Sequence, residues 1–241
     1  YVSRLNAARY FDNCLNRVCV DYNYLNWYRT TCLNEPKGRI WVIPNCMSQC
    51  LNKEILLERQ KISRSEIEVL FARRFTKIRG TELMIHAIKE ISRRYKNVNF
   101  TFAGEGEEDE RLRTELRDCK VTFTKYGSSQ SMEFHSNYDI AVIPSLGSEG
   151  TSLSVIEAMG AGCAVVATSV GGITNIVIDD YNGLLAAPES KALVHSLEKL
   201  INDRNLRLRL GQNAYATAEH SFSLEKWKAR WANVIREVSN G

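Results

Sequence analysis

No stretch of this 241-residue chain approaches about eighteen consecutive apolar residues, so the sequence offers no candidate for a membrane-spanning helix. A large excess of charge of one sign is also missing. The chain has 32 basic and 28 acidic residues, and a net charge of +4 is too small to indicate nucleic acid as a partner. The beginning of the sequence lacks both the apolar run of a signal peptide and an initiator methionine, so we expect a piece of a longer protein. The composition that remains, 44% hydrophobic and 25% charged, is ordinary for a globular protein with a buried core.

Zinc-ligand spacing is missing as well, although the chain has seven cysteines. Cys46 and Cys50 form a CxxxC pair, but no second pair follows at the spacing of a zinc site. An odd number of scattered cysteines predicts reduced, mostly buried thiols in a cytosolic protein.

From about Ile67 onward, short apolar runs alternate with longer stretches of helical periodicity. The apolar runs predict strands at 67–71, 98–103, 121–124, 140–144 and 164–168. The periodic stretches predict helices at 81–95, 108–119, 131–138, 152–160, 191–202, 206–220 and 224–238, the last with Ser223 as its N-cap. This alternation predicts an α/β fold: a Rossmann-like parallel sheet with helices on both faces, and a ligand site at the carboxyl ends of its strands.

The first fifty residues are expected to form a separate unit. Strand-like runs at 17–21 and 39–44 flank a helical stretch at 22–33, which makes one βαβ unit. One such unit is too small to be a domain by itself. A polar helical linker at 51–64 separates it from the main sheet.

The most informative segment runs from Pro144 to Gly160. A buried strand ends at Pro144, a loop of small residues follows, and a helix is predicted to begin near Thr151 or Ser152. The first N–H groups of a helix have no internal acceptor and lie at the positive end of its dipole, so they suit a phosphate. Gly150 lets the backbone approach a ligand closely, and the two hydroxyl residues after it can add donors.

Two glutamates lie eight residues apart in this segment. Glu157, inside the predicted helix, can reach back to the crevice and accept two hydrogen bonds from a vicinal diol such as a ribose. Glu149, in the loop, is predicted to face the group beyond the phosphates. A pair of solvated surface glutamates is the alternative, and the surrounding strand, loop, glycine and helix start favour the binding site.

Arginines follow the neighbouring predicted strand. Arg74 and Arg79 would leave its carboxyl end and reach the same crevice, where guanidinium groups can hold a diphosphate bidentately. A solvated basic loop is the alternative. The glycine turn at Gly104 and Gly106 also follows a strand, although such a turn is weak by itself.

Together these residues resemble the retaining GT-B glycosyltransferases of family GT4. The resemblance extends from about Ile40 to Val238, with Arg79 in place of the family's lysine. The motifs that carry it, in chain order, are Ile43-Pro-Asn45, Arg74 with Arg79-Gly80, Phe102-Ala-Gly-Glu-Gly106, Ile143-Pro-Ser145 with Glu149-Gly150, Glu157-Ala-Met159 with Gly162, Val170-Gly-Gly172 and Asn182-Gly-Leu-Leu185.

The resemblance implies a role for each candidate residue. Glu149, Arg74 and Arg79 would be the catalytic set, with Glu149 against the donor sugar and the arginines on the diphosphate. Glu157 would bind the ribose. The remaining donor-binding residues would be Gly150, Thr151, Ser152 and Leu153 at the distal phosphate and Gly104 and Tyr126 near the nucleotide. No metal and no cofactor are implied, because the donor is itself a nucleoside diphosphate sugar.

The resemblance also implies that the chain is the C-terminal half of a GT-B fold. Residues 1–50 would be the remnant of an N-terminal acceptor domain, 51–222 the nucleotide-sugar-binding domain, and 223–241 a helix crossing back. Trp227 and Trp231 on that helix would pack against the N-terminal domain, and contact with a membrane surface is the alternative.

The expected activity is transfer of a hexosyl group to a glycan or lipid-linked acceptor in polysaccharide biosynthesis. The expected location is the cytoplasm, with peripheral contact with the inner face of the membrane left open. Two alternatives remain: a non-catalytic nucleotide-sugar-binding subunit that needs a partner chain, and a GT-B-like epimerase or phosphorylase.

Overall fold

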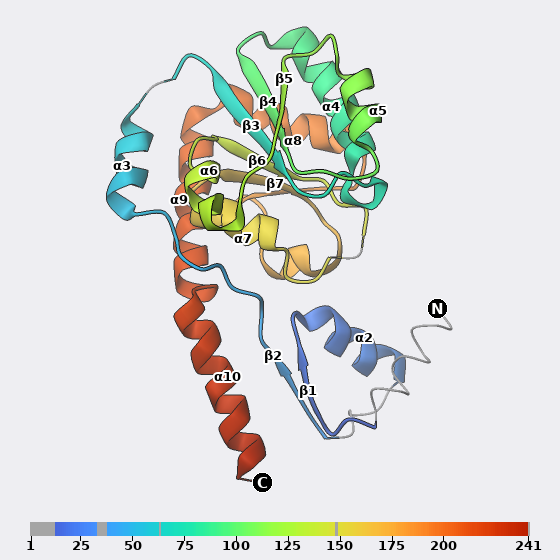
Figure 1. The fold of residues 1–241 in the computed structure, drawn as a ribbon, viewed down its shortest axis with the longest axis vertical. Coiled ribbons are helices and arrows are strands. Elements are labelled where there is room, and N and C mark those ends of the chain that lie inside the picture. Colours follow the sequence, from blue (N-terminus) through green and yellow to red (C-terminus); the bar gives the residue numbers. More distant parts are fainter. Residues whose placement is uncertain (1–12, 33–37, 63, 148, 241) are drawn as a thin grey trace.

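The computed structural model describes residues 13–32, 38–62, 64–147 and 149–240, and a six-stranded parallel sheet forms its centre (Figure 1). The strand order is β5-β4-β3-β6-β7-β8. The strands are β3 (Ile67–Ala72), β4 (Val98–Ala103), β5 (Val121–Thr124), β6 (Ile140–Ile143), β7 (Ala164–Thr168) and β8 (Leu184–Ala186). Five of them match predicted strands. The sequence analysis missed β8 because three residues are too few to show a period.

The direction in which the sheet grows reverses once. From β3 the chain adds β4 and β5 toward one edge, and it then returns to place β6 on the other side of β3 and to add β7 and β8. The reversal therefore lies between β3 and β6. In an open parallel sheet, the connections leaving two such strands turn to opposite sides, which opens a crevice at their carboxyl ends.

Helices cover both faces of the sheet, because successive strand residues point to opposite sides. Val69 and Phe100 belong to the core on one face, which is completed by α4 (Thr81–Arg94), α5 (Asp109–Glu115) and α8 (Ser190–Asn202). Leu70 and Val165 belong to the core on the other, which is completed by α3 (Lys53–Lys61), α6 (Ser131–His135), α7 (Leu153–Gly160) and α9 (Arg204–Ser221). The predicted α/β fold class is confirmed.

Several helix starts follow from a single capping residue. The Asn52 side chain accepts hydrogen bonds from two first-turn N–H groups of α3. Asp203 accepts one from the N–H of Leu206 in α9, and Ser223 accepts one from the N–H of Lys226 in α10 (Leu224–Ser239). The predicted cap at Ser223 is confirmed. α5 and α6 are shorter than predicted, because their polar ends leave the helix for turns.

The N-terminal unit consists of β1 (Asn16–Cys19), α2 (Tyr22–Cys32) and β2 (Arg39–Val42), and its two strands pair in parallel. The predicted end of this helix at Leu33 lies outside the described residues. The backbone N–H of Tyr22 donates to Asn175 of the main domain over 3.1 Å. The C-terminal helix α10 runs beside this unit (Figure 1), where Trp41 of β2 donates to Glu237 over 3.2 Å.

The prediction that the cysteines are mostly buried is wrong for the part of the chain that the structure describes. Only Cys163 is buried there, Cys14 is exposed, and the other four are partly exposed. Whether a thiol is buried depends on how the segment that carries it packs, and composition does not determine this packing. Across the described residues, no helix is both long enough and apolar enough to cross a membrane.

Candidate functional site

The candidate site lies at the point where the strand order reverses. Arg73 directly follows the last residue of β3, and Ser145 lies just beyond the end of β6. The Arg73 Nη1 donates to the Ser145 Oγ over 2.8 Å, so a side chain bridges the two strand ends. The fold thus brings residues 72 positions apart into one cluster.

Glu149 is the centre of this cluster. Its Oε1 accepts hydrogen bonds from Arg73 Nη2, Arg79 Nη1 and Ser145 Oγ, each over 2.5 Å. The side chains of Glu149 and Arg73 are only 6% and 5% exposed, whereas that of Arg79 is 29% exposed. Two cations share one carboxylate, so the cluster keeps a net positive charge beside the crevice.

The ionisation of the cluster follows from these contacts. Burial by itself would raise the pKa of Glu149, but Arg73, Ser145 and Arg79 outweigh it and hold that pKa below its usual value. Burial lowers the pKa of Arg73, while Glu149 opposes the shift. An arginine still remains charged at neutral pH, so the pair is ionic.

A cleft of about 720 Å³ opens next to this cluster. Seven predicted site residues line it: Arg74, Arg79, Glu149, Gly150, Thr151, Ser152 and Leu153. Arg74 is exposed, and Leu153 and Ser154 of α7 also line the cleft. All three residues of the predicted catalytic set therefore face one cleft.

The other three predicted residues, Gly104, Tyr126 and Glu157, line a second cavity of about 370 Å³. Arg73 and Ser154 line both cavities, so the two spaces adjoin. Burial raises the pKa of Glu157, and a hydrogen bond with Ser131 offsets part of that shift. Burial and the nearby Glu157 raise the pKa of Tyr126 to about 12. Tyr126 is held flat against Phe134, with ring centroids 4.4 Å apart.

The start of α7 differs from the capped helices described above. Its N-cap residue Ser152 makes no side-chain capping bond, which leaves the first N–H groups of the helix to be satisfied by something else. A phosphate in the cleft is suited to that position. Thr151, in contrast, already donates its hydroxyl proton to the carbonyl of Val20.

Two residues of the cleft wall come from the N-terminal part of the chain. Val20 follows β1, and Asn45 lies in the segment that follows β2. Asn45 Nδ2 donates to the carbonyl of Thr151 over 2.9 Å, so Thr151 is held from both sides. A Cβ on Gly150 would lie 2.9 Å from the Val20 side chain. The small residue therefore also makes room for the loop between β1 and α2.

Gly104 has a specific reason to be glycine. Its φ is +150°, and a Cβ there would lie 2.3 Å from the carbonyl oxygen of Arg73. Only glycine allows this turn after β4 to pass so close to the start of the arginine segment.

Sequence reasoning missed Arg73, Ser145, Val20 and Asn45 as lining or linking residues of the site. The Arg73-Arg74 doublet directly after a strand was a signal that either arginine could face the crevice. Val20 and Asn45 carried no such signal, because only the packing of the N-terminal unit brings them to the cleft.

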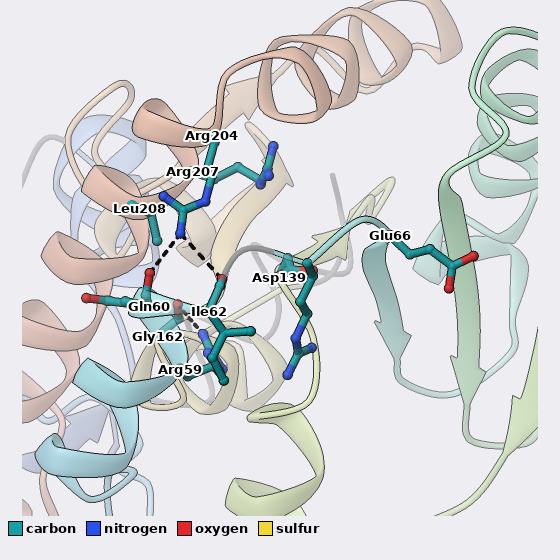
Figure 2. A pocket seen from close by; sticks show the side chains of 10 residues that line it. Arg59, Gln60, Ile62, Glu66, Asp139, Gly162, Arg204, Arg207 and Leu208 are labelled. Atoms are coloured by element: carbon teal, nitrogen blue, oxygen red, sulfur yellow. Dashed lines mark hydrogen bonds between the residues drawn. The ribbon is translucent and has the colours of Figure 1, made fainter.

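Another enclosed space, of about 50 Å³, lies at the opposite end of the sheet, where Asp139 precedes β6 (Figure 2). Its arginines are used to join chain segments: Arg59 donates to the carbonyls of Ser136 and Gly162, and Arg204 to that of Gln60. Within the described ranges, no three His, Cys, Asp or Glu side chains gather as a metal site would require.

The fold and the cleft define an α/β protein with an arginine-lined cleft at the carboxyl ends of β3 and β6. Residues 52–217 match the family described as glycosyl transferases group 1, and the chain belongs to this family. An uncharacterised glycosyltransferase of Methanocaldococcus jannaschii is 31% identical over 209 residues, which cover 85% of this chain and 55% of that protein.

Two solved structures resemble the chain closely. The C-terminal domain of a group 1 glycosyl transferase from Francisella tularensis is 26% identical, with a TM-score of 0.61, over 74% of this chain and 97% of that one. An Anabaena protein in complex with UDP-glucose is 19% identical, with a TM-score of 0.78, over 100% of this chain and 68% of that one, and this likeness concerns the fold alone. The chain spans about half the length of the curated relatives it matches.

Proposed function

We propose that this chain is the donor-binding part of a glycosyltransferase that moves a sugar from a nucleoside diphosphate sugar to a glycan or lipid-linked acceptor. The observation that carries this proposal is the pair of adjoining cavities at the start of α7. One contains Glu149 and the arginines, and the other contains Glu157 and Tyr126. A ligand with a diol at one end, a diphosphate in the middle and a sugar at the other end fits this order of groups.

In the proposed complex, Glu157 accepts hydrogen bonds from the ribose hydroxyls, and the base lies near Tyr126. Arg74, Arg79 and the first N–H groups of α7 hold the diphosphate. They stabilise the negative charge that develops as the nucleoside diphosphate leaves. The donor sugar lies against Glu149.

Retention of configuration is part of the proposal. Glu149 Oε1 already accepts three hydrogen bonds, which makes the carboxylate a weak nucleophile. Attack of the acceptor hydroxyl on the same face from which the diphosphate leaves therefore fits the site better than a covalent intermediate on Glu149.

The division of labour along the chain is also proposed. Residues 1–50 would belong to an acceptor domain, 51–222 would bind the donor, and 223–241 would cross back, in keeping with the contact between Trp41 and Glu237. We further propose that the protein acts in the cytoplasm, and that peripheral contact with a membrane brings a lipid-linked acceptor to it.

The proposal is tested by a thermal-shift panel of UDP, GDP, ADP and their sugars, with UDP-glucose first because the Anabaena structure contains it. One nucleotide should raise the Tm by several degrees in the wild type and by none in Glu157→Ala. Glu133→Ala, on an exposed turn of α6, is the matched control and should respond as the wild type does. If no nucleotide shifts the Tm of the wild type, the donor site is wrong.

We propose that binding needs no metal ion, because two arginines and a helix start supply the positive charge. The same Tm shift in the presence of EDTA is the expected result. A shift that disappears with EDTA and returns with Mg²⁺ or Mn²⁺ would contradict this part of the proposal.

A further inference from the structure

Arg73 is the most deeply buried cation of the cluster formed with Arg79 and Glu149. Its side chain is 5% exposed, it bridges Ser145 and Glu149, and it lines both cavities. Its Nε is buried and has no hydrogen-bond partner among the described residues. Burying a charge with a donor left unpaired is unfavourable, which points to a role of Arg73 beyond stability.

The geometry at Glu149 supplies that reason. Arg73, Arg79 and Ser145 all donate to Oε1, and the described residues place no hydrogen-bond donor on Oε2. Arg73 and Ser145 come from the ends of two buried strands, so they fix the carboxylate to the rigid part of the fold. Arg79, on the loop after β3, is the more exposed of the two cations and faces the cleft.

We propose that Arg73 is a positioning residue of the donor site, which acts by fixing the Glu149 carboxylate in its ionised form with Oε2 left for the donor sugar. By sharing the charge of Glu149, it also keeps that carboxylate from neutralising Arg79, which leaves positive charge for the diphosphate. This inference rests on the proposed function. Without Arg73, Glu149 would be free to turn fully onto Arg79.

Other charged groups lie in or near the cleft that Glu149 lines. Arg74 and Glu107 line the same cleft, and Asp21 lies behind the backbone of Gly150. Of the two arginines in direct contact with Glu149, Arg73 directly follows the end of β3, whereas Arg79 lies farther along the loop. The test therefore changes Arg73 and leaves these groups in place.

The first measurement needs no ligand. The pKa of Glu149 is read from the chemical shift of its ¹³C-labelled carboxyl, assigned with Glu149→Gln, in the wild type, Arg73→Met, Arg73→Lys and Arg117→Met. Loss of the Arg73 charge should raise the Glu149 pKa by about one unit or more. Arg73→Lys should raise it less, and Arg117→Met, at a solvent-exposed surface arginine, should not change it. An unchanged Glu149 pKa in Arg73→Met would overturn the proposal.

The second measurement is binding of UDP and UDP-glucose by titration calorimetry, or of the nucleotide that the thermal-shift panel selects. Arg73→Met should weaken binding of the nucleotide sugar about tenfold or more and that of the free nucleotide less, because Glu149 faces the sugar. Arg73→Lys, which keeps the charge, should lie between the wild type and Arg73→Met. It also keeps the test valid if Arg73→Met does not fold.

The outcomes separate the two claims. A wild type that binds the nucleotide sugar, with an Arg73→Met variant of equal affinity, overturns the role of Arg73 and leaves the proposed function in place. A wild type that binds no nucleotide overturns the proposed function, and the donor role of Arg73 with it.

Discussion

At the scale of single residues, Glu149 and Glu157 have opposite surroundings although both belong to one short segment. Glu149 is held by two arginines and a serine, so its pKa is lowered despite burial. Among the described residues Glu157 forms no ion pair, so burial dominates and raises its pKa. The two carboxylates therefore make contributions of opposite sign to folding stability at neutral pH.

We expect Glu149→Gln to lower the free energy of unfolding at pH 7 by about 3 kcal/mol, because it leaves the buried Arg73 without its counterion. A lowered folded-state pKa stabilises the fold above the ordinary glutamate pKa of about 4.3, and this stabilisation is lost as the pH falls through the lowered value. The difference between variant and wild type should thus shrink below about pH 4. Urea denaturation between pH 3 and 8 measures it, and a difference that is independent of pH would contradict the ion pair.

Glu157→Gln should do the opposite and raise the Tm by about 2–4 °C at pH 7, which corresponds to roughly 1 kcal/mol. The raised folded-state pKa penalises the ionised form above a pH of about 4.3, so the gain should grow as the pH rises through the raised value. Nucleotide binding should be lost at the same time. Calorimetric melting at pH 4 and pH 7 checks this, and a destabilised variant at pH 7 would show that Glu157 has an ionic partner.

At the scale of elements, the site depends on how the turn after β3 meets the end of β6. Gly80 ends the short helix η1 (Lys77–Arg79) and precedes α4 with a φ of +85°. A Cβ at this position would lie 1.8 Å from the carbonyl oxygen of Pro144, which is backbone and cannot rotate away. The close contact fixes Arg79 next to the loop that carries Glu149.

Gly80→Ala should therefore lower the free energy of unfolding by at least about 2 kcal/mol, from the steric contact and the positive φ together. Gly127→Ala is the matched control, because a Cβ there would have its nearest neighbour 3.6 Å away and the residue has no positive φ. Denaturant unfolding of both variants measures the effect. Equal stabilities would mean that the turn after β3 can move away from β6.

At the scale of the whole molecule, several of the described contacts between the N-terminal unit and the main domain lie at the site. Thr151 donates to the carbonyl of Val20, Asn45 donates back to Thr151, and Tyr22 binds Asn175. The loop that binds the distal phosphate in the proposal is thus also the contact surface for this unit. Ligand binding and the placement of the unit should be coupled.

We expect Thr151→Val to speed hydrogen exchange of the α2 amides about tenfold or more, because the carbonyl of Val20 loses its partner. Exchange in β3 and β6 should stay unchanged. Thr114→Val, whose hydroxyl bonds only within its own helix, is the control. Unchanged exchange in α2, measured by mass spectrometry, would show that other contacts hold the unit.

Local patterns along the chain were sufficient to predict much of this protein. The apolar runs predicted five of the six strands of the main sheet, because a strand buried on both faces is a continuous apolar run. Ser223 was recognised as a cap because capping depends on a side chain and the backbone a few residues away. The strand, loop, glycine and helix around Glu149 predicted a ligand site for the same reason.

The three-dimensional packing decided the rest. From the sequence, either Arg73 or Arg74 could have faced Glu149. The outcome depends on how β3 lies beside β6, which brings Arg73 to Ser145, 72 positions away in the chain. The depressed pKa of Glu149 and the raised pKa of Glu157 follow from the neighbours that this pairing supplies. Val20 and Asn45 reach the cleft only because the N-terminal unit packs against Thr151. Contacts between distant segments leave no period or spacing in the sequence, so only the tertiary structure determines them.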